Sequence, residues 1–172
     1  FLGYKAYYDS NGYLTFRFTN PAPVQSSGSG YTLNGARIML DPGHGGNDPG
    51  ALGNNPNYTE AVINRMIASK VKAKLENLGA TVSMIDTTGT MPSLAQRVAA
   101  GKAFAPHLFL SIHQNSYVSS GPTGTESYYF YSYQKVIGQN LTSAISSAAN
   151  WNNRGAKYNA FYVTRDSELP AN

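Results

Sequence analysis

Aromatic and polar positions near the start of the chain follow a pattern typical of β-structure. Two short runs rich in aromatic residues, 4–8 and 13–18, lie on either side of Asn11 and Gly12. An Asn-Gly pair favours a tight turn because both positions tolerate a positive φ, so residues 1–20 predict a β-hairpin. Two strands alone are only marginally stable in water, and we therefore expect this hairpin to be the end of an upstream region.

Residues 21–31 have a different composition, with Pro first and Ser and Gly after it. Pro stiffens a chain whereas Gly and Ser loosen it, so this stretch predicts a linker. Residues 32–172 then form the main domain.

From Arg37 onward, short apolar runs alternate with stretches in which apolar residues recur every three to four positions. Thr59 is suited to cap the first of these helices and Gly79 to follow its end, and Ser93 with Gln96 forms a capping box for the next. The predicted strands are 37–40, 81–85, 108–112, 126–131 and 161–163, and the predicted helices are 60–78, 93–104 and 137–148. This order indicates βαβ units, and therefore an α/β fold: a single twisted, mostly parallel sheet flanked by helices, with the hairpin as an appendage.

Composition narrows the function. The chain has 172 residues with no Cys, 41% hydrophobic and 13% charged residues. This excludes a disulfide scaffold, a Cys-ligated zinc finger, a thiol nucleophile and a disordered polyelectrolyte. The net charge of +4 comes from scattered Lys and Arg, so we expect no nucleic-acid partner. No apolar run approaches the roughly 18 residues of a membrane span, and we expect none.

Two of the three histidines follow predicted strands. His44 lies in a glycine-rich run after the first strand, and His113 ends the third. Ligands bind outside the carboxyl ends of strands in such sheets, so both imidazoles are expected to face one crevice if their strands are neighbours. Glu60 is a candidate third ligand, although Glu in a first helical turn is also common because it complements the helix dipole. His107 is interpreted as a hydrogen-bonded structural residue.

Two His and one carboxylate, with no Cys, suit zinc with an open coordination position. Zinc lowers the pKa of bound water from about 15.7 to about 7, which makes hydroxide available near neutral pH. The predicted chemistry is therefore hydrolysis of an amide or ester.

Several motifs occur together and in order: 41–46, Glu60 with Asn64, Ser93 with Arg97, 111–115 and 124–126. Over residues 37–172 the chain resembles the zinc-dependent N-acetylmuramoyl-L-alanine amidases of the LytC/AmiC type. The resemblance implies a secreted bacterial cell-wall hydrolase, or autolysin, that acts outside the cell on peptidoglycan as a monomer. It would cleave the amide between N-acetylmuramic acid and L-Ala.

The same resemblance implies site residues. His44, Glu60 and His113 would be the zinc ligands. Asn64, Arg97 and Asn115 are motif positions that would bind substrate, although each is equally suited to support a ligand from behind.

One part of the family pattern is missing. Family members carry a general-base Glu in a late Pro-Ala-x-Leu-Val-Glu stretch, which residues 169–172 only begin, so the expected Glu falls beyond Asn172. Glu168 precedes the Pro and does not match, and Glu126 is interpreted as a structural carboxylate at a strand end. The catalytic base is therefore unknown within this chain, and the domain is expected to be cut short.

Two alternatives stay open. A non-catalytic peptidoglycan-binding module or pseudoenzyme would bind sacculi without releasing stem peptides. Another zinc hydrolase, such as a peptidase, would cut between amino acids and not at the L-Ala amino group.

We expect the 172-residue chain to bind zinc but to hydrolyse muramoyl-peptide slowly, because loss of a general base costs about 10²–10⁴ in rate. A turnover assay with and without a C-terminal extension measures this difference. Full activity of the short form would contradict the expectation.

Overall fold

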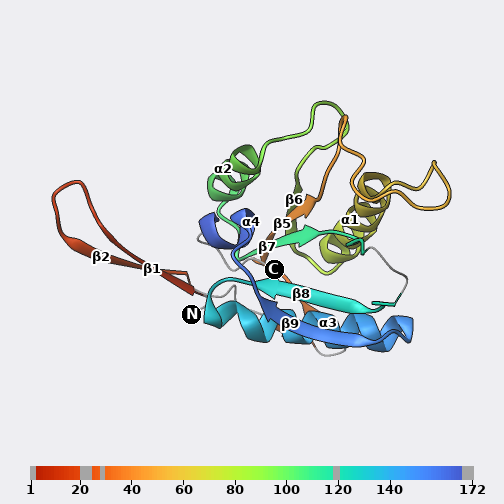
Figure 1. Ribbon diagram of the computed structural model, residues 1–172. Helices are drawn as coiled ribbons and strands as arrows, with labels where there is room; N and C mark the ends of the chain where they lie inside the picture. The colour runs from red at the N-terminus through yellow and green to blue at the C-terminus, as the bar shows by residue number, and fades with distance from the viewer. Residues whose placement is uncertain (1–2, 20–24, 28–29, 118–120, 168–172) are drawn as a thin grey trace.

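The computed structural model describes residues 3–19, 25–27, 30–117 and 121–167. A parallel three-stranded sheet lies at its centre (Figure 1). β5 (Arg37–Pro42) is the middle strand, with β6 (Thr81–Met84) on one side and β7 (Leu108–Ile112) on the other. Because all three strands run in one direction, the loops that follow them leave from the same edge.

Helices cover both faces of this sheet. α1 (Glu60–Asn77) packs on one face, where Val71 and Leu75 contact a core that includes Leu40. α2 (Leu94–Phe104) packs on the other face, where Phe104 contacts a core that includes Met39 and Phe109. Burial on both faces explains why Ile38, Met39 and Leu40 of β5 form an apolar run and not an alternating pattern.

The predicted ends of both helices are confirmed. The Thr59 hydroxyl accepts a hydrogen bond from the Val62 amide at 3.4 Å, and Gly79 follows α1 with a φ of 93°. The Ser93 hydroxyl and the Gln96 side chain form the capping box at the start of α2.

A second parallel pair follows in the chain. β8 (Thr125–Tyr129) pairs with β9 (Asn153–Tyr158), and α3 (Lys135–Ala149) lies along both after the short 3₁₀ turn η1 (Ser132–Gln134) (Figure 1). The predicted α/β fold with parallel strands flanked by helices is confirmed. Within the described residues after Arg37, the strands form two hydrogen-bonded groups, β6-β5-β7 and β8-β9, where a single sheet was expected.

The prediction of a strand at 161–163 is wrong. Phe161 is the N-cap of a short helix, α4 (Tyr162–Asp166), and Val163 packs against the core beside α2. β9 was not predicted, because its sequence Asn-Arg-Gly-Ala-Lys-Tyr has no apolar alternation. Pairing with β8 and packing against α3 decide its conformation, so tertiary context overrides local propensity in both places.

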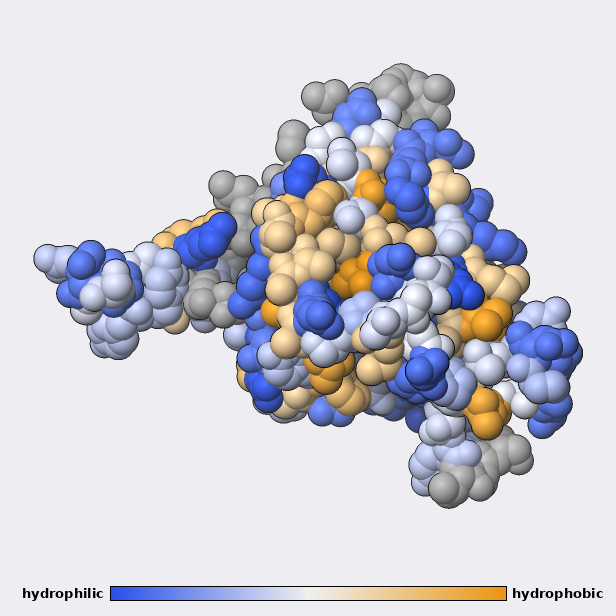
Figure 2. Space-filling model, turned by 90° about the horizontal axis from the view of Figure 1, so that it is seen from above, coloured by the Kyte–Doolittle hydropathy of each residue, from blue (hydrophilic) through white to orange (hydrophobic). Residues whose placement is uncertain are grey.

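The N-terminal hairpin is confirmed as β1 (Gly3–Tyr8) paired antiparallel with β2 (Leu14–Thr19). The Asp9 carboxylate accepts from the amides of Asn11 and Tyr13, and Gly12 has a φ of 81°. The hairpin stands out from the main body as an arm, and Figure 2 shows it from above.

The predicted linker contains two short strands. β3 (Gln25–Ser27) and β4 (Gly30–Thr32) pair antiparallel, and the other linker residues, 21–24 and 28–29, lie outside the described ones. The division at residues 1–20, 21–31 and 32–172 stays a prediction. None of the helices in the described part of the chain has the length and apolarity that a bilayer crossing requires.

A buried ion pair fastens the end of β5 to α2. Arg97 and Asp41 are 3% and 1% exposed, and the Arg97 guanidinium donates to the Asp41 carboxylate. The same guanidinium donates to the carbonyls of Pro42 and His44, at 2.9 and 2.8 Å. The Ser111 hydroxyl donates to the other Asp41 oxygen at 2.9 Å. The pair therefore joins the ends of β5 and β7 and holds the His44 loop from below.

Replacement of this guanidinium should destabilise the fold. Arg97→Met leaves the Asp41 carboxylate buried without its cation, and we expect a loss of about 3–5 kcal/mol in the free energy of unfolding. Urea unfolding followed by circular dichroism measures it. Lys70→Met, at an exposed position of α1, is the control and should change stability by less than about 0.5 kcal/mol. Equal stability of the two variants would contradict the assigned role.

Candidate metal centre

Three side chains from separate parts of the chain meet at the edge where β5 and β7 end. His44 follows β5, Glu60 begins α1 and His113 follows β7. Glu60 Oε1 lies 3.3 Å from His44 Nε2 and 3.1 Å from His113 Nδ1. Each residue offers a ligand atom within 4.8 Å of the other two. Two imidazoles and a carboxylate at this spacing form a donor set that fits one zinc ion.

The loop backbone sets the two imidazoles side by side. His44 has a φ of 64°, in the left-handed region that non-glycine residues seldom adopt. A Cβ at Gly43 would lie 2.1 Å from Cε1 of His113, so only glycine lets that ring lie against the loop. The Gly43 amide also donates to the Ile112 carbonyl at 2.9 Å. As a result, the two ring centroids are 5.0 Å apart.

Glu60 is buried and held in its ionised form. It is 5% exposed, and burial by itself favours its neutral form. The Ala51 amide donates to Oε2 and the Gln114 amide to Oε1, each at 2.9 Å. These two bonds and the nearby imidazoles outweigh burial and lower the pKa of Glu60 below its usual value. The carboxylate is therefore fixed and charged, as a metal ligand requires.

Asp48 orients the first imidazole, a role that the sequence analysis missed. Its Oδ2 lies 2.7 Å from His44 Nδ1, and its Oδ1 accepts from the Gly50 amide at 3.0 Å. An ionised carboxylate can only accept, so His44 Nδ1 donates in this bond. The bond is the main cause of a lowered pKa at Asp48. The Nε2 lone pair is thereby directed toward Glu60. The sequence did contain a signal for this role, because Asp48 is the only acidic residue between His44 and Glu60.

Two of the expected substrate residues lie beneath the cluster. Asn64 is fully buried, donates to the Gly43 carbonyl at 3.2 Å and accepts from the Gln114 side chain at 3.1 Å. Arg97 is buried below the His44 loop, as described above. Both contact the backbone or side chains around the ligands, and their contact with substrate stays an untested prediction.

The remaining predicted residues lie to one side. Asn115 is exposed and donates to Glu126 Oε1 at 2.7 Å, and its contact with substrate is likewise untested. His107 accepts from the Arg37 amide at 3.0 Å, as expected of a structural histidine. Glu168 lies outside the described residues, as does the stretch 169–172.

Four side chains donate hydrogen bonds to the Glu126 carboxylate. Tyr128 and Asn115 donate to Oε1 at 2.6 and 2.7 Å, while Arg154 Nε, at 2.8 Å, and Lys157 Nζ contact Oε2. Burial opposes its ionisation, but the bonds from Lys157, Tyr128 and Arg154 outweigh burial and lower the pKa of Glu126 to about 2. Such a group takes up no proton near neutral pH, which agrees with its interpretation as structural. The sequence analysis had not singled out Arg154 or Lys157.

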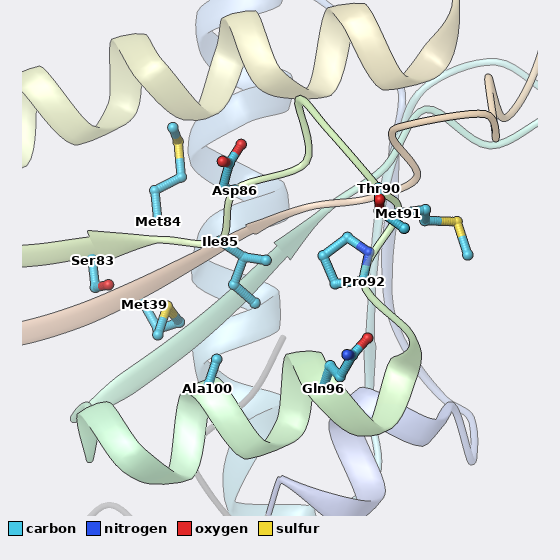
Figure 3. Close-up of a pocket in the computed structure, with 10 residues that line it drawn as sticks. All are labelled: Met39, Ser83, Met84, Ile85, Asp86, Thr90, Met91, Pro92, Gln96 and Ala100. Atoms are coloured by element: carbon cyan, nitrogen blue, oxygen red, sulfur yellow. The ribbon is translucent and has the colours of Figure 1, made fainter.

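Two cavities of about 410 Å³ each are lined by residues other than His44, Glu60 and His113. One lies between β6 and α2 (Figure 3), where Ile85, Pro92 and Ala100 are among the apolar residues that line it and Asp86 is its single charged one. The other is lined by the His44 loop and α1, and Arg65 is its single charged residue. Neither cavity is lined by a histidine, so neither offers the donor set of the His44, Glu60 and His113 cluster.

Comparison with known sequences gives a consistent result. A family model for N-acetylmuramoyl-L-alanine amidases matches residues 38–172. The chain is 40% identical over 141 residues to the N-acetylmuramoyl-L-alanine amidase LytC of Bacillus subtilis. The matched region covers 80% of this chain and 28% of LytC. It is 37% identical over 140 residues to the probable cell wall amidase LytH of Staphylococcus saprophyticus. This matched region covers 81% of this chain and 46% of LytH. The chain thus spans less than half the length of these relatives.

Solved structures show the same fold. The catalytic domain of CwlV, an N-acetylmuramoyl-L-alanine amidase from Bacillus (Paenibacillus) polymyxa, is 32% identical with a TM-score of 0.74 over 79% of this chain and 76% of that one. The N-acetylmuramoyl-L-alanine amidase of Clostridium difficile 630 gives the same values. Together with the sequence match, these likenesses establish that the chain belongs to the N-acetylmuramoyl-L-alanine amidase family.

Proposed function

We propose that this domain hydrolyses the amide bond between N-acetylmuramic acid and L-Ala in peptidoglycan, with zinc as its metal. The observation that carries the proposal is the meeting of His44, Glu60 and His113 at one edge of the sheet. We further propose that it acts as a monomer outside the cell, associated with the cell wall. The net charge of +4 is compatible with an anionic wall.

His44 Nε2, Glu60 Oε1 and His113 Nδ1 would hold the zinc ion, since these atoms face one another. When bound, zinc polarises a carbonyl oxygen and lowers the pKa of a water molecule to about 7. Asp48 keeps the Nδ1 proton of His44 in place and so preserves the Nε2 lone pair. The Ala51 and Gln114 amides keep the Glu60 carboxylate in one orientation.

Asn64 and Arg97 support the proposal as positioning residues. Asn64 holds the Gly43 carbonyl and the Gln114 side chain, and Arg97 holds the His44 carbonyl. Each thereby fixes backbone next to a ligand. The expectation that these 172 residues turn over slowly stays a prediction, which the turnover assay with and without a C-terminal extension measures.

The proposal is tested with purified peptidoglycan and added zinc. We expect one zinc per chain and the release of stem peptides that begin with a free L-Ala amino group, detected by amino-terminal labelling and mass spectrometry. Binding to sacculi without release would support a binding module, and cuts between amino acids would support a peptidase. Either outcome would overturn the proposed amidase reaction.

Glu60→Gln and His44→Ala should each remove bound zinc and the hydrolysis that depends on it, because each deletes a ligand of the cluster. Glu76→Gln is the matched control for Glu60→Gln, since it makes the same change at an exposed position of the same helix. Zinc content is measured after dialysis. Retention of stoichiometric zinc by Glu60→Gln would show that the metal lies elsewhere.

Asp48→Ala should weaken zinc binding about 10–100-fold without loss of fold, because removal of the carboxylate that orients a ligating imidazole has this effect in other zinc sites. Competition with a chromophoric chelator measures the affinity. Asp86→Ala is the control, since Asp86 is exposed and its carboxylate accepts hydrogen bonds from Thr88 in its own turn. Equal zinc affinities in the two variants would show that Asp48 does not support His44.

A further inference from the structure

We propose that Arg154 and Lys157, held together by Glu126 beside the metal centre, bind a carboxylate on the peptide stem of the substrate. This inference rests on the proposed amidase function and names the part of the substrate that the domain recognises. It arises from an ion cluster that the proposed hydrolysis does not otherwise use.

A bulge in β9 brings the two cations onto one face. Residues 154 and 157 are three apart, so in a regular strand their side chains would point to opposite faces. Thr125 pairs with Asn153 but Glu126 pairs with Gly155, so Arg154 is the extra residue of a β-bulge. Gly155 has a φ of 75° with open space around it, so its role is conformational. The bulge lets both cations contact Glu126 Oε2.

The cluster keeps binding capacity after these contacts are made. Glu126 is 11% exposed at its side chain, whereas Arg154 and Lys157 are 33% and 39% exposed. Two cations and one carboxylate leave a net charge of +1. A guanidinium has five N–H donors, of which Nε–H serves Glu126, and a lysine ammonium has three. The remaining donors therefore suit an incoming carboxylate, which forms charge-assisted hydrogen bonds.

The cluster is linked to the metal centre through Asn115. Asn115 donates to Glu126 and follows His113 by two residues, so the Cα atoms of His113 and Asn115 lie at most about 7 Å apart. A peptide stem that begins at the scissile L-Ala carries a carboxyl group on the residue after it. This group is either a free carboxylate or an amide, so the two cations would distinguish the two forms.

The experiment compares two ligands that differ only at this group: N-acetylmuramoyl-L-alanyl-D-glutamate γ-methylamide, which has a free α-carboxylate, and its α-carboxamide (D-isoglutamine) counterpart. Isothermal titration of the metal-free chain measures both affinities without turnover, because the proposed hydrolysis depends on zinc. We expect the unmodified chain to bind the carboxylate form about tenfold more tightly, the size of one charge-assisted hydrogen bond. Arg154→Gln with Lys157→Gln should abolish the preference, whereas Lys157→Arg should retain it.

Lys70→Gln with Lys74→Gln is the matched control, because it removes two positive charges from exposed positions of α1. It should leave the preference unchanged. Thermal melts of every variant establish that the fold persists. Equal binding of the two ligands by the unmodified chain, or a preference that survives loss of both cations, would overturn this inference.

The failure of this inference is separate from that of the proposed function. A chain that binds zinc and releases stem peptides, yet binds the two ligands equally, overturns only the carboxylate site. A chain that prefers the carboxylate form but holds no zinc supports the site and overturns the zinc amidase.

Discussion

The parallel pairing of β5 with β7 is the constraint on which the site depends. The loops after both strands leave from one edge of the sheet, so His44 and His113 meet although they are far apart in the chain. α1 packs on one face of this sheet, and its first residue, Glu60, reaches the same edge. An antiparallel neighbour would send the second histidine to the opposite edge.

The sheet edge alone does not fix the ligands, and a layer of buried polar groups beneath it does. Arg97 binds Asp41 and the His44 carbonyl, while Asn64 binds the Gly43 carbonyl. A loop with a left-handed residue such as His44 would adopt other conformations without these bonds. Each buried group is compensated by a partner, because an unpaired charge in that position would cost several kcal/mol.

Two glutamates illustrate how surroundings separate roles. Both have a lowered pKa, and burial opposes ionisation in both. Glu60 accepts from two main-chain amides and faces two imidazoles, which leaves it suited to share its charge with a cation. Glu126 accepts from four side chains, including Arg154 and Lys157, so its charge is already balanced. The same residue type thus serves as a ligand in one place and as a clamp in the other.

The sequence by itself determined the features that a few neighbouring residues encode. The Asn-Gly turn, the caps at Thr59 and Ser93 and the apolar run of β5 act within one turn or one strand, so they were predicted correctly. β9 and α4 were not, because pairing with β8 and packing near α2 decided them against their local propensity. Tertiary structure likewise decided that Asp48 orients His44 and that Arg154 joins Lys157 on one face. The first contact depends on the path of the loop between His44 and Asp48, and the second depends on the bulge in β9. Neither can be read from the periodicity or spacing of residues along the chain.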